Sequence, residues 1–147
     1  MSVQSNTDGF KHEGIFSPNG LVQEVVFRET CASAGIDPSE VTYMEAHGTG
    51  TPTGDPQEVG AIYRVYCENR DKDKPLLLGS VKSNMGHSES TAGLSSLAKA
   101  IISIQTGFIP PNMHFNKLNP KLEPMFQDGS LQVCSERVPP SCGVIHC

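Results

Sequence analysis

The chain has 147 residues, of which 37% are hydrophobic, so it is long and apolar enough for one domain with a core. Its net charge of −5 and the absence of a basic stripe argue against nucleic acid as a partner. It has no run of about 18 apolar residues, so we expect no membrane span, and the polar residues 1–9 predict no signal peptide and a cytoplasmic protein.

Five cysteines are scattered along the chain, at Cys31, Cys67, Cys134, Cys142 and Cys147. Their number is odd and no two have the C-x-x-C spacing, which argues against a disulfide framework and against a zinc site. We therefore expect reduced thiols and no bound metal.

The first part of the chain predicts a loop, a helix and a strand. Residues 1–20 are rich in Asn, Gly, Ser and Pro and are expected to form a loop. Apolar residues at helical spacing predict a helix over residues 21–34, and Gly35 suits the left-handed position that closes it. Residues 41–46 include Val, Thr and Tyr and predict a short strand.

A second helix is predicted to start at Asp55, which can cap it, with Pro56 in the first helical position. Glu58 falls where the partner residue of a capping box would lie. Apolar and aromatic residues at helical spacing continue this helix to about Asn69.

The nearly continuous apolar residues 76–81 predict a strand of a parallel sheet that is covered on both faces. Residues 82–87 are predicted to form a loop, and residues 89–105 a third helix. The expected core stripe of this helix consists of Leu94, Leu97, Ala98 and Ile101.

Beyond the third helix, residues 110–120 predict an ordered loop, residues 131–134 predict an edge strand, and residues 141–147 match no element. The whole pattern indicates an α/β fold. Because two parallel strands cannot close a sheet, we expect the chain to be part of a larger domain.

Two polar loops follow the two predicted central strands. One reads His47-Gly-Thr-Gly-Thr, and the other reads Lys82-Ser-Asn-Met-Gly-His87. Ligands bind at the carboxyl ends of the strands in open α/β sheets, so both imidazoles and the ammonium are expected to converge on one pocket.

The expected chemistry is activation of a carbonyl. The ammonium of Lys82 disfavours protonation of nearby imidazoles, by like-charge repulsion. Neutral His47 and His87 can each donate one N–H to a developing oxyanion, and each fixed donor contributes roughly 3 kcal/mol to the transition state. Glu89 can orient Lys82 or His87, or serve only as an acid at the start of a helix.

A dinucleotide-binding oxidoreductase is a weaker interpretation of the first loop. Gly48, Gly50 and Gly54 form a loose glycine-rich pattern between a strand and a helix, and Lys82 could bind the phosphate of NADP. Pro52, however, removes an amide that the phosphates would need. Asp55 also places a carboxylate where the pyrophosphate would bind.

The two loops, together with Glu89-x-x-Ala92-Gly93-Leu94, closely resemble motifs of the β-ketoacyl synthases of the thiolase-like superfamily. The resemblance implies the C-terminal half of a layered αβαβα ketosynthase domain over residues 1–138, followed by a divergent tail over residues 139–147. The segments 6–9 and 110–115 look most like the ketosynthase of animal-type fatty acid synthases, with modular polyketide synthases as near neighbours.

The resemblance implies decarboxylative Claisen condensation of a malonyl thioester with an acyl thioester. His47 and His87 would be the catalytic histidines, with Lys82 and Glu89 as a supporting charged pair. Thr49 and Thr51 resemble the threonines that hydrogen-bond the phosphopantetheine arm of an acyl carrier protein. No cofactor is expected to bind tightly, and the family usually forms homodimers.

The nucleophilic cysteine of the family, in an Asp-Thr-Ala-Cys-Ser-Ser type turn, has no match in this chain. Cys31 lies late in a predicted amphipathic helix, without the strand-to-helix turn that activates a thiol. Two hypotheses follow. The chain is part of an active transferase, itself inactive in isolation, or it is a non-catalytic remnant that binds an acyl-carrier arm or another partner.

Overall fold

A computed structural model of the chain describes residues 2–12, 14, 17–139 and 144–146. Within these residues, four parallel strands form one sheet in the order β3-β2-β1-β4. The strands are β1 (Val41–Glu45), β2 (Leu76–Gly79), β3 (Leu131–Val133) and β4 (Val144–His146). This arrangement confirms the α/β prediction and the edge position of the strand near residue 131.

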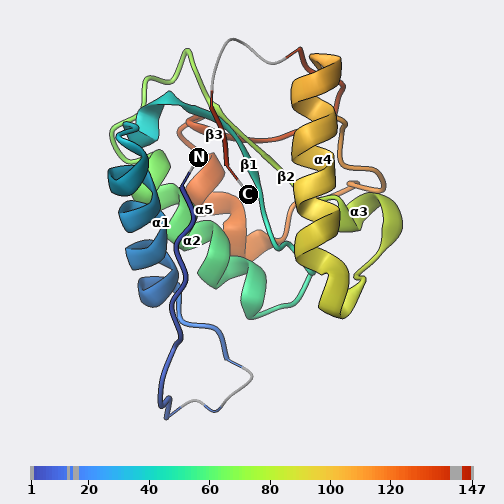
Figure 1. Ribbon diagram of the computed structural model, residues 1–147. Helices are drawn as coiled ribbons and strands as arrows, with labels where there is room; N and C mark the ends of the chain where they lie inside the picture. The colour runs from blue at the N-terminus through green and yellow to red at the C-terminus, as the bar shows by residue number, and fades with distance from the viewer. Residues whose placement is uncertain (1, 13, 15–16, 140–143, 147) are drawn as a thin grey trace.

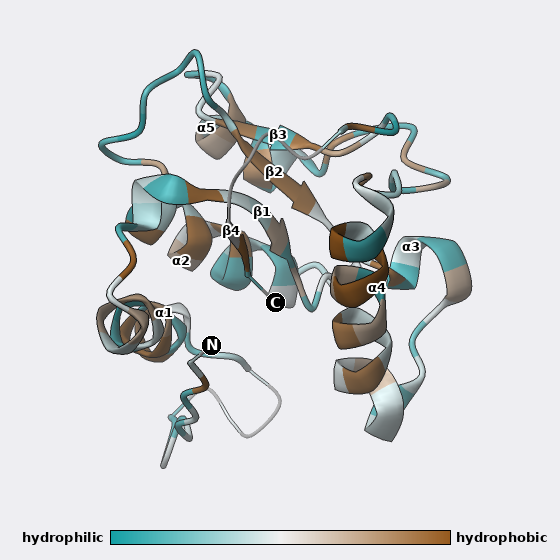
Figure 2. Cartoon of the chain, turned by 45° about the horizontal axis from the view of Figure 1, so that its top comes forward, coloured by the Kyte–Doolittle hydropathy of each residue, from teal (hydrophilic) through white to brown (hydrophobic). Residues whose placement is uncertain are grey.

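Helices cover both faces of the sheet (Figures 1 and 2). α1 (Gly20–Ala34) and α2 (Gly54–Tyr66) lie on one face, and α4 (Ala92–Thr106) lies on the other. The short helices α3 (Lys82–Met85) and α5 (Glu123–Phe126) complete the set, with single turns of 3-10 helix at Pro38–Glu40, Glu89–Thr91 and Pro120–Leu122. Within the described residues, no helix is long and apolar enough to cross a membrane.

The ends of α1 follow from local sequence. The side chain of Asn19 accepts hydrogen bonds from the first amides of the helix, at Leu21 and Val22. Gly35 closes the helix with φ +66°, a left-handed conformation that glycine adopts without a steric penalty. The amide of Ile36 then bonds the carbonyl of Cys31 at 3.0 Å, so the predicted glycine end is confirmed.

The larger core lies between the sheet and the pair α1 and α2. Met44 and Leu78 from the strands pack with Ile62 and Tyr66 from α2. Cys31 and Cys67 are buried in the same core, at 4% and 1% exposure. Both therefore act as small apolar residues, which agrees with the interpretation of Cys31 as an ordinary helix residue.

The tips of β1 and β2 lie side by side. Glu45 is the register partner of Gly79, and the amide of Ala46 donates to the carbonyl of Gly79 at 2.8 Å. A Cβ at Gly79 would meet the Tyr43 hydroxyl and ring, so only glycine leaves room for that side chain. The loops that follow β1 and β2 therefore begin side by side at the same edge of the sheet.

Two expectations about local structure are wrong. Residues 82–87 were expected to form a loop, but α3 occupies Lys82–Met85. The last residues were expected to match no element, but β4 pairs with β1, where the open edge of β1 supplies hydrogen-bonding partners. His146 Nδ1 lies 2.8 Å from the Tyr66 hydroxyl. Cys142 and Cys147 lie outside the described residues.

The expected core stripe of α4 is also wrong. Leu94, Leu97 and Ile101 are 68%, 45% and 45% exposed, and Ala98 is exposed as well. The buried face consists of Ala92, Lys99, Ala100 and Ser103. Small side chains let the helix approach the sheet closely, and the ion pair of Lys99 with Glu45 compensates for the burial of its charge. The large apolar side chains consequently face away from the sheet.

We expect this exposed apolar face of α4, defined by Leu94, Leu97, Ile101 and Ile104, to make the isolated chain self-associate. Sedimentation velocity over a concentration series should show oligomers, and the double substitution Leu97→Lys and Ile101→Glu should raise the monomer fraction. The matched substitution Val25→Lys, at a 51% exposed position on α1, should not. A monomeric native chain at every concentration would contradict this expectation.

Candidate functional site

The two predicted histidines meet at the carboxyl edge of the sheet. His47 comes two residues after the end of β1, and His87 comes two residues after the end of α3. The centroids of their rings are 5.3 Å apart and the ring planes are inclined at 86°. The parallel pairing of β1 and β2 produces this convergence, because it sets both following loops at the same edge.

The loop that carries His47 is held by two acidic residues near the start of α2, Asp55 and Glu58. Glu58 accepts the amide of His47 at 2.6 Å through Oε1 and the amide of Gly48 at 2.9 Å through Oε2. Asp55 Oδ1 accepts the amide of Gly50 at 3.0 Å. The loop is therefore anchored at three amides by side chains that approach from α2.

These contacts show that the expected capping box is wrong. The helix begins at Gly54, one residue before the expected cap Asp55, and its N-cap Thr53 makes no side-chain cap bond. Both acids are already engaged by the amides of the preceding loop, so they do not close the amides of their own helix. The engaged Asp55 also occupies the helix start, where a pyrophosphate would bind, which weakens the dinucleotide interpretation.

Gly48 is required for the close approach of the two loops. Its φ is +48°, and an added Cβ would lie 2.9 Å from the Cβ of Ser80, at the end of β2. The Ser80 hydroxyl donates to the carbonyl of His47 at 3.3 Å. Glycine at this position thus permits the backbone of one loop to rest on the other.

The charges around His47 favour a neutral ring. Desolvation lowers the pKa of His47 below its usual value, and the positive charge of Lys82 and the neighbouring His87 lower it further, while Asp55 acts in the opposite direction. At neutral pH the imidazole of His47 is therefore uncharged and can donate one N–H. Burial raises the pKa of Glu58, although the amides of Gly48 and His47 act against that rise.

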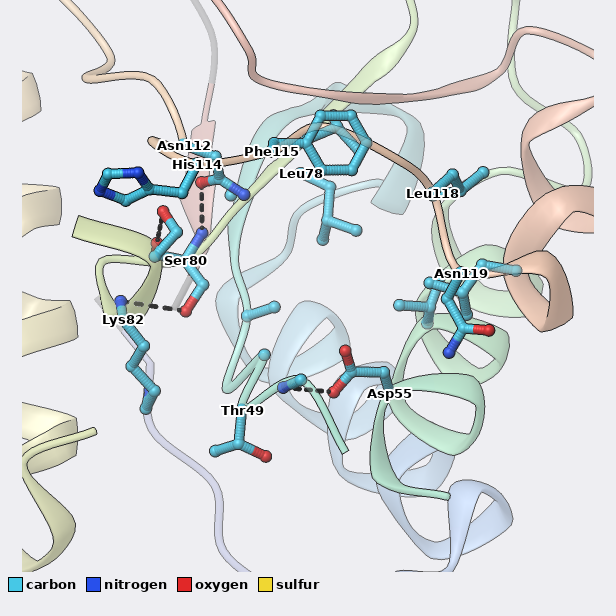
Figure 3. Close-up of a pocket in the computed structure, with 18 of the residues that line it drawn as sticks. Thr49, Asp55, Leu78, Ser80, Lys82, Asn112, His114, Phe115, Leu118 and Asn119 are labelled. Atoms are coloured by element: carbon cyan, nitrogen blue, oxygen red, sulfur yellow. Dashed lines mark hydrogen bonds between the residues drawn. The ribbon is translucent and has the colours of Figure 1, made fainter. Parts of the chain in front are cut away.

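A cavity of about 530 Å³ opens beside the two loops (Figure 3). Three of the residues predicted for the site line it, namely Thr49, Lys82 and His87. His47 is not among the lining residues, although its ring contacts that of His87. Lys82 is 9% exposed, so an ammonium group is available at the wall with little competition from bulk water.

Thr51 and Glu89 do not line this cavity. The Thr51 hydroxyl accepts the amide of Gly54 at 3.0 Å and so forms part of the turn into α2. Glu89 is exposed in the 3-10 turn before α4, and among the described residues it forms no ion pair with Lys82. The expected Lys82–Glu89 pair is therefore absent, because Lys82 is buried while Glu89 faces solvent.

The opposite wall comes from the ordered segment after α4. Asn112 Oδ1 accepts the amide of Ser80 at 2.9 Å, and Asn84 Nδ2 donates to the carbonyl of Pro111 at 3.2 Å. These bonds attach the segment to the end of β2 and to α3, and place His114 and other side chains of the segment on the cavity wall. The predicted ordered loop is confirmed, but its place in the site was missed.

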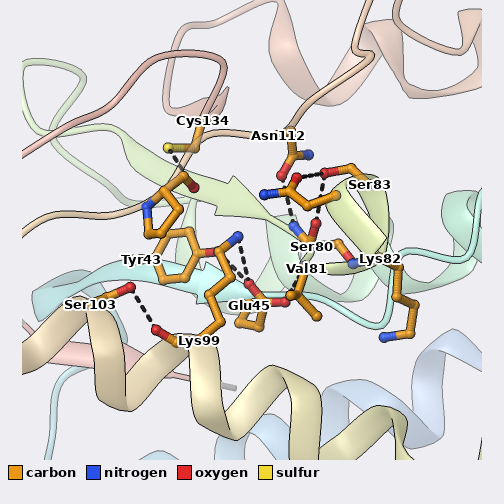
Figure 4. Close-up of polar contacts among 12 residues, drawn as sticks. Tyr43, Glu45, Ser80, Val81, Lys82, Ser83, Lys99, Ser103, Asn112 and Cys134 are labelled. Atoms are coloured by element: carbon orange, nitrogen blue, oxygen red, sulfur yellow. Dashed lines mark hydrogen bonds and ion pairs between the residues drawn. The ribbon is translucent and has the colours of Figure 1, made fainter. Parts of the chain in front are cut away.

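A buried polar cluster lies beneath the strand tips (Figure 4). Glu45 accepts the Tyr43 hydroxyl, accepts the amide of Val81 at 2.6 Å, and lies 3.1 Å from Lys99 Nζ. Sequence reasoning missed this cluster. The available signal was one acid in an otherwise uncharged strand and one lysine in an otherwise uncharged helix, which are the expected partners of a buried ion pair.

No cysteine lines the cavity among the described residues. Cys31, Cys67 and Cys134 are all buried away from it. Burial raises the pKa of the Cys67 thiol to about 11, and burial also raises that of Cys134, so neither forms a thiolate readily. In the part of the chain that the structure describes, no cluster of three potential metal ligands is found.

The paired rings of His47 and His87, with Lys82 beside them, can polarise a carbonyl group and stabilise negative charge on its oxygen.

The family described as "Beta-ketoacyl synthase, C-terminal domain" matches residues 1–116. Among curated relatives, a probable polyketide synthase of Dictyostelium discoideum is 42% identical over 135 residues, which cover 91% of this chain and 5% of the relative. A highly reducing polyketide synthase of Aspergillus terreus is 45% identical over 134 residues, covering 91% of this chain and 5% of the relative. The chain thus spans a small part of either synthase.

Solved ketosynthase structures have the same fold over nearly the whole chain. Ketosynthase twelve of the bacillaene polyketide synthase from Bacillus amyloliquefaciens matches with a TM-score of 0.84 and 31% identity, covering 96% of this chain and 25% of that one. The module 1 ketosynthase of the bacillaene synthase from Bacillus amyloliquefaciens FZB42 matches with a TM-score of 0.83 and 34% identity, covering 92% and 26%.

Proposed function

Because this chain belongs to the β-ketoacyl synthase family, in which it matches the C-terminal domain, we propose that it supplies the carbonyl-activating half of a decarboxylative condensation site. The observation that carries the proposal is the contact between the rings of His47 and His87, 5.3 Å apart beside a cavity. The nucleophile would come from a protein segment that this chain does not contain.

In the proposed reaction, an acyl group is held as a thioester on that nucleophilic cysteine. A malonyl thioester loses carbon dioxide, and the electrons of the broken carbon–carbon bond form an enolate. The N–H groups of His47 and His87 stabilise the negative oxygen. The enolate carbon then bonds to the acyl carbonyl carbon, and the cysteine thiolate leaves.

The remaining predicted residues take supporting roles in this proposal. The charge of Lys82 helps to keep the imidazole of His47 neutral, without a contact from Glu89, which acts as an acid at the start of α4. Thr49 on the cavity wall donates or accepts a hydrogen bond with the phosphopantetheine arm. The Thr51 hydroxyl oxygen accepts the amide of Gly54, and its hydroxyl hydrogen remains available to donate a hydrogen bond to the same arm.

The partners in this proposal are an acyl carrier protein, which presents malonyl on its phosphopantetheine arm, and a second copy of the complete synthase in a homodimer. The relatives named as polyketide synthases favour a polyketide-type extension. The segments 6–9 and 110–115, which resemble animal-type fatty acid synthases, favour fatty acid synthesis. Both products arise from the same condensation chemistry.

A second candidate is a non-catalytic domain that binds the acyl-carrier arm. It is favoured by the buried state of Cys31, Cys67 and Cys134, which leaves no thiol facing the cavity among the described residues. Condensation in the presence of an external nucleophilic cysteine separates this candidate from the first.

The isolated chain should form no β-ketoacyl product from malonyl-carrier protein and an acyl thioester, because no cysteine faces its cavity within the described residues. It should bind the carrier protein more tightly with the phosphopantetheine arm than without it, and Thr49→Val should weaken that difference. Mass spectrometry of the products and calorimetric titration with both carrier forms measure these results. Product from the isolated chain would contradict the need for an outside cysteine, and equal binding of both carrier forms would contradict recognition of the arm.

A further inference from the structure

Glu45 is a charged residue at the tip of the central strand β1, yet it is only 4% exposed. Its Oε1 accepts the amide of Val81 at 2.6 Å, and its Oε2 accepts the Tyr43 hydroxyl and lies 3.1 Å from Lys99 Nζ (Figure 4). One carboxylate therefore joins three separate parts of the fold: the end of β1, the segment that follows β2, and α4.

Stability alone does not account for this carboxylate. A buried ion pair is often replaceable by apolar residues of similar volume without loss of stability. An uncharged residue at position 45 combined with an apolar residue at position 99 would avoid the desolvation of both charges. The particular feature of Glu45 is its second oxygen, which accepts a backbone amide of the neighbouring segment.

That backbone contact lies next to the proposed site on both sides. His47 follows Glu45 by two residues, and Lys82 follows Val81 directly. Regular pairing between the strands stops at the bond from the Ala46 amide to the Gly79 carbonyl, at 2.8 Å. Beyond it, the direct bond between the two loops is that from the Ser80 hydroxyl to the His47 carbonyl, at 3.3 Å. The shorter bond from Val81 to Glu45 is the stronger tie between the tips.

The rest of the cluster holds the carboxylate in place. Lys99 Nζ also lies 5.4 Å from the centre of the Tyr43 ring, so it contacts both the carboxylate and the residue that donates to it. The Tyr43 side chain lies in the space that a Cβ at Gly79 would fill. Lys99 of α4 and Tyr43 of β1 thus hold Oε2 of Glu45 in place. This orients its other oxygen, Oε1, toward the amide of Val81.

We propose that Glu45 is a positioning residue, whose bond to the Val81 amide sets the spacing between His47 and the segment that carries Lys82 and His87. This role rests on the proposed function, because the spacing matters for catalysis only if both histidines act on the substrate. Lys99 and Tyr43 support Glu45 and have no contact with substrate in this assignment.

Two double variants separate the acceptor from the charge. Glu45→Gln with Lys99→Met removes both charges but keeps an oxygen that can accept the Val81 amide. Glu45→Leu with Lys99→Met removes both charges and the acceptor. Urea unfolding of the two variants shows whether they are equally stable, so that a difference at the site is not a difference in folding.

The measured quantity is the titration midpoint of His47. This midpoint depends on the groups around the ring, and its measurement requires no catalytic turnover. Carbethoxylation of each histidine at a series of pH values, resolved by mass spectrometry at low protein concentration, gives the midpoint of each ring. The charged or titratable groups that face His47 are Lys82, His87 and Asp55. Desolvation, followed by the positive charges of Lys82 and His87, holds the pKa of His47 below the usual value near 6.5, and Asp55 acts in the opposite direction. His12, outside the cavity wall, is the internal reference.

We expect the Gln-containing variant to keep the wild-type midpoint of His47 and the Leu-containing variant to move it up toward the usual value. Equal His47 midpoints in both variants and the wild type would overturn the proposal. If the Leu-containing variant does not fold, Val81→Pro is the alternative test, because Val81 has φ −58°, which proline adopts, and the change removes the amide donor while Glu45 and Lys99 stay in place. An unchanged midpoint in Val81→Pro would equally overturn it. Because these experiments measure no turnover, an unchanged midpoint would overturn the role of Glu45 without contradicting the proposed condensation, which the product assay tests separately.

Discussion

Replacing His87 by Ala should lower condensation by about 10²- to 10³-fold, because one fixed donor to the developing oxyanion is lost. The measurement requires a nucleophilic cysteine, so we would graft this chain in place of the matching segment of ketosynthase twelve from the bacillaene synthase, with which it shares the fold at a TM-score of 0.84. Acylation of the cysteine and condensation are followed separately, by mass spectrometry of the enzyme and of the product. Acylation should fall much less than condensation.

The control for this substitution is His12→Ala, at an exposed position outside the cavity wall, which should leave both steps unchanged. His87→Gln, which keeps an N–H donor, should recover part of the lost condensation rate. A His87→Ala graft in which acylation and condensation fall equally would contradict the role in carbonyl activation, because that role belongs to the second step.

Breaking the buried ion pair should have the largest effect on folding. Lys99→Met alone, or Glu45→Gln alone, should lower the free energy of unfolding by about 3–5 kcal/mol, since each leaves one uncompensated buried charge. The double variant with both changes should recover most of the loss, because no buried charge remains. Urea unfolding monitored by circular dichroism measures all three.

An exposed ion pair provides the comparison. Arg28 pairs with Glu24 at 2.9 Å on α1, where the Arg28 side chain is 52% exposed. Arg28→Ala should change the free energy of unfolding by less than about 1 kcal/mol. Single variants of the buried pair that cost no more than Arg28→Ala, or a double variant that loses as much as the two singles together, would show that the charges do not depend on each other.

The position of the site could be predicted because it follows from topology. Neighbouring strands of a parallel sheet have their carboxyl ends at the same edge, so the loops that follow β1 and β2 lie next to each other. The helix end at Gly35 was equally predictable, since a left-handed closing residue favours glycine. These features depend on rules that act over a few residues or on the direction of a strand.

The errors arose where a residue had two possible partners. Glu58 has the spacing of a capping box, but the amides of the preceding loop lie within its reach and take its carboxylate. Likewise, the spacing of the apolar residues predicted that the core stripe of Leu94, Leu97, Ala98 and Ile101 would be the buried face of α4. The ion pair of Lys99 with Glu45 and the small residues on the opposite side decide which face meets the sheet. Neither competition is visible in local sequence.

β4 could not be predicted for a related reason. Its residues, Val144–His146, are too few to show strand alternation, and their pairing depends on the free edge of β1, about a hundred residues earlier in the chain. The contact of His146 with Tyr66 is likewise a long-range feature. Short strands at the edge of a sheet are specified by their neighbours more than by their own sequence.

The most direct measurement is a crystal structure of the grafted ketosynthase with an unreactive malonyl thioester analogue bound. We expect a ring nitrogen of His47 and one of His87 both to lie within hydrogen-bonding distance of the same thioester carbonyl oxygen, with the arm passing Thr49. A carbonyl bound elsewhere, or imidazole rings turned away from it toward solvent, would contradict the assignment of the two strand tips as the carbonyl-activating half of the site.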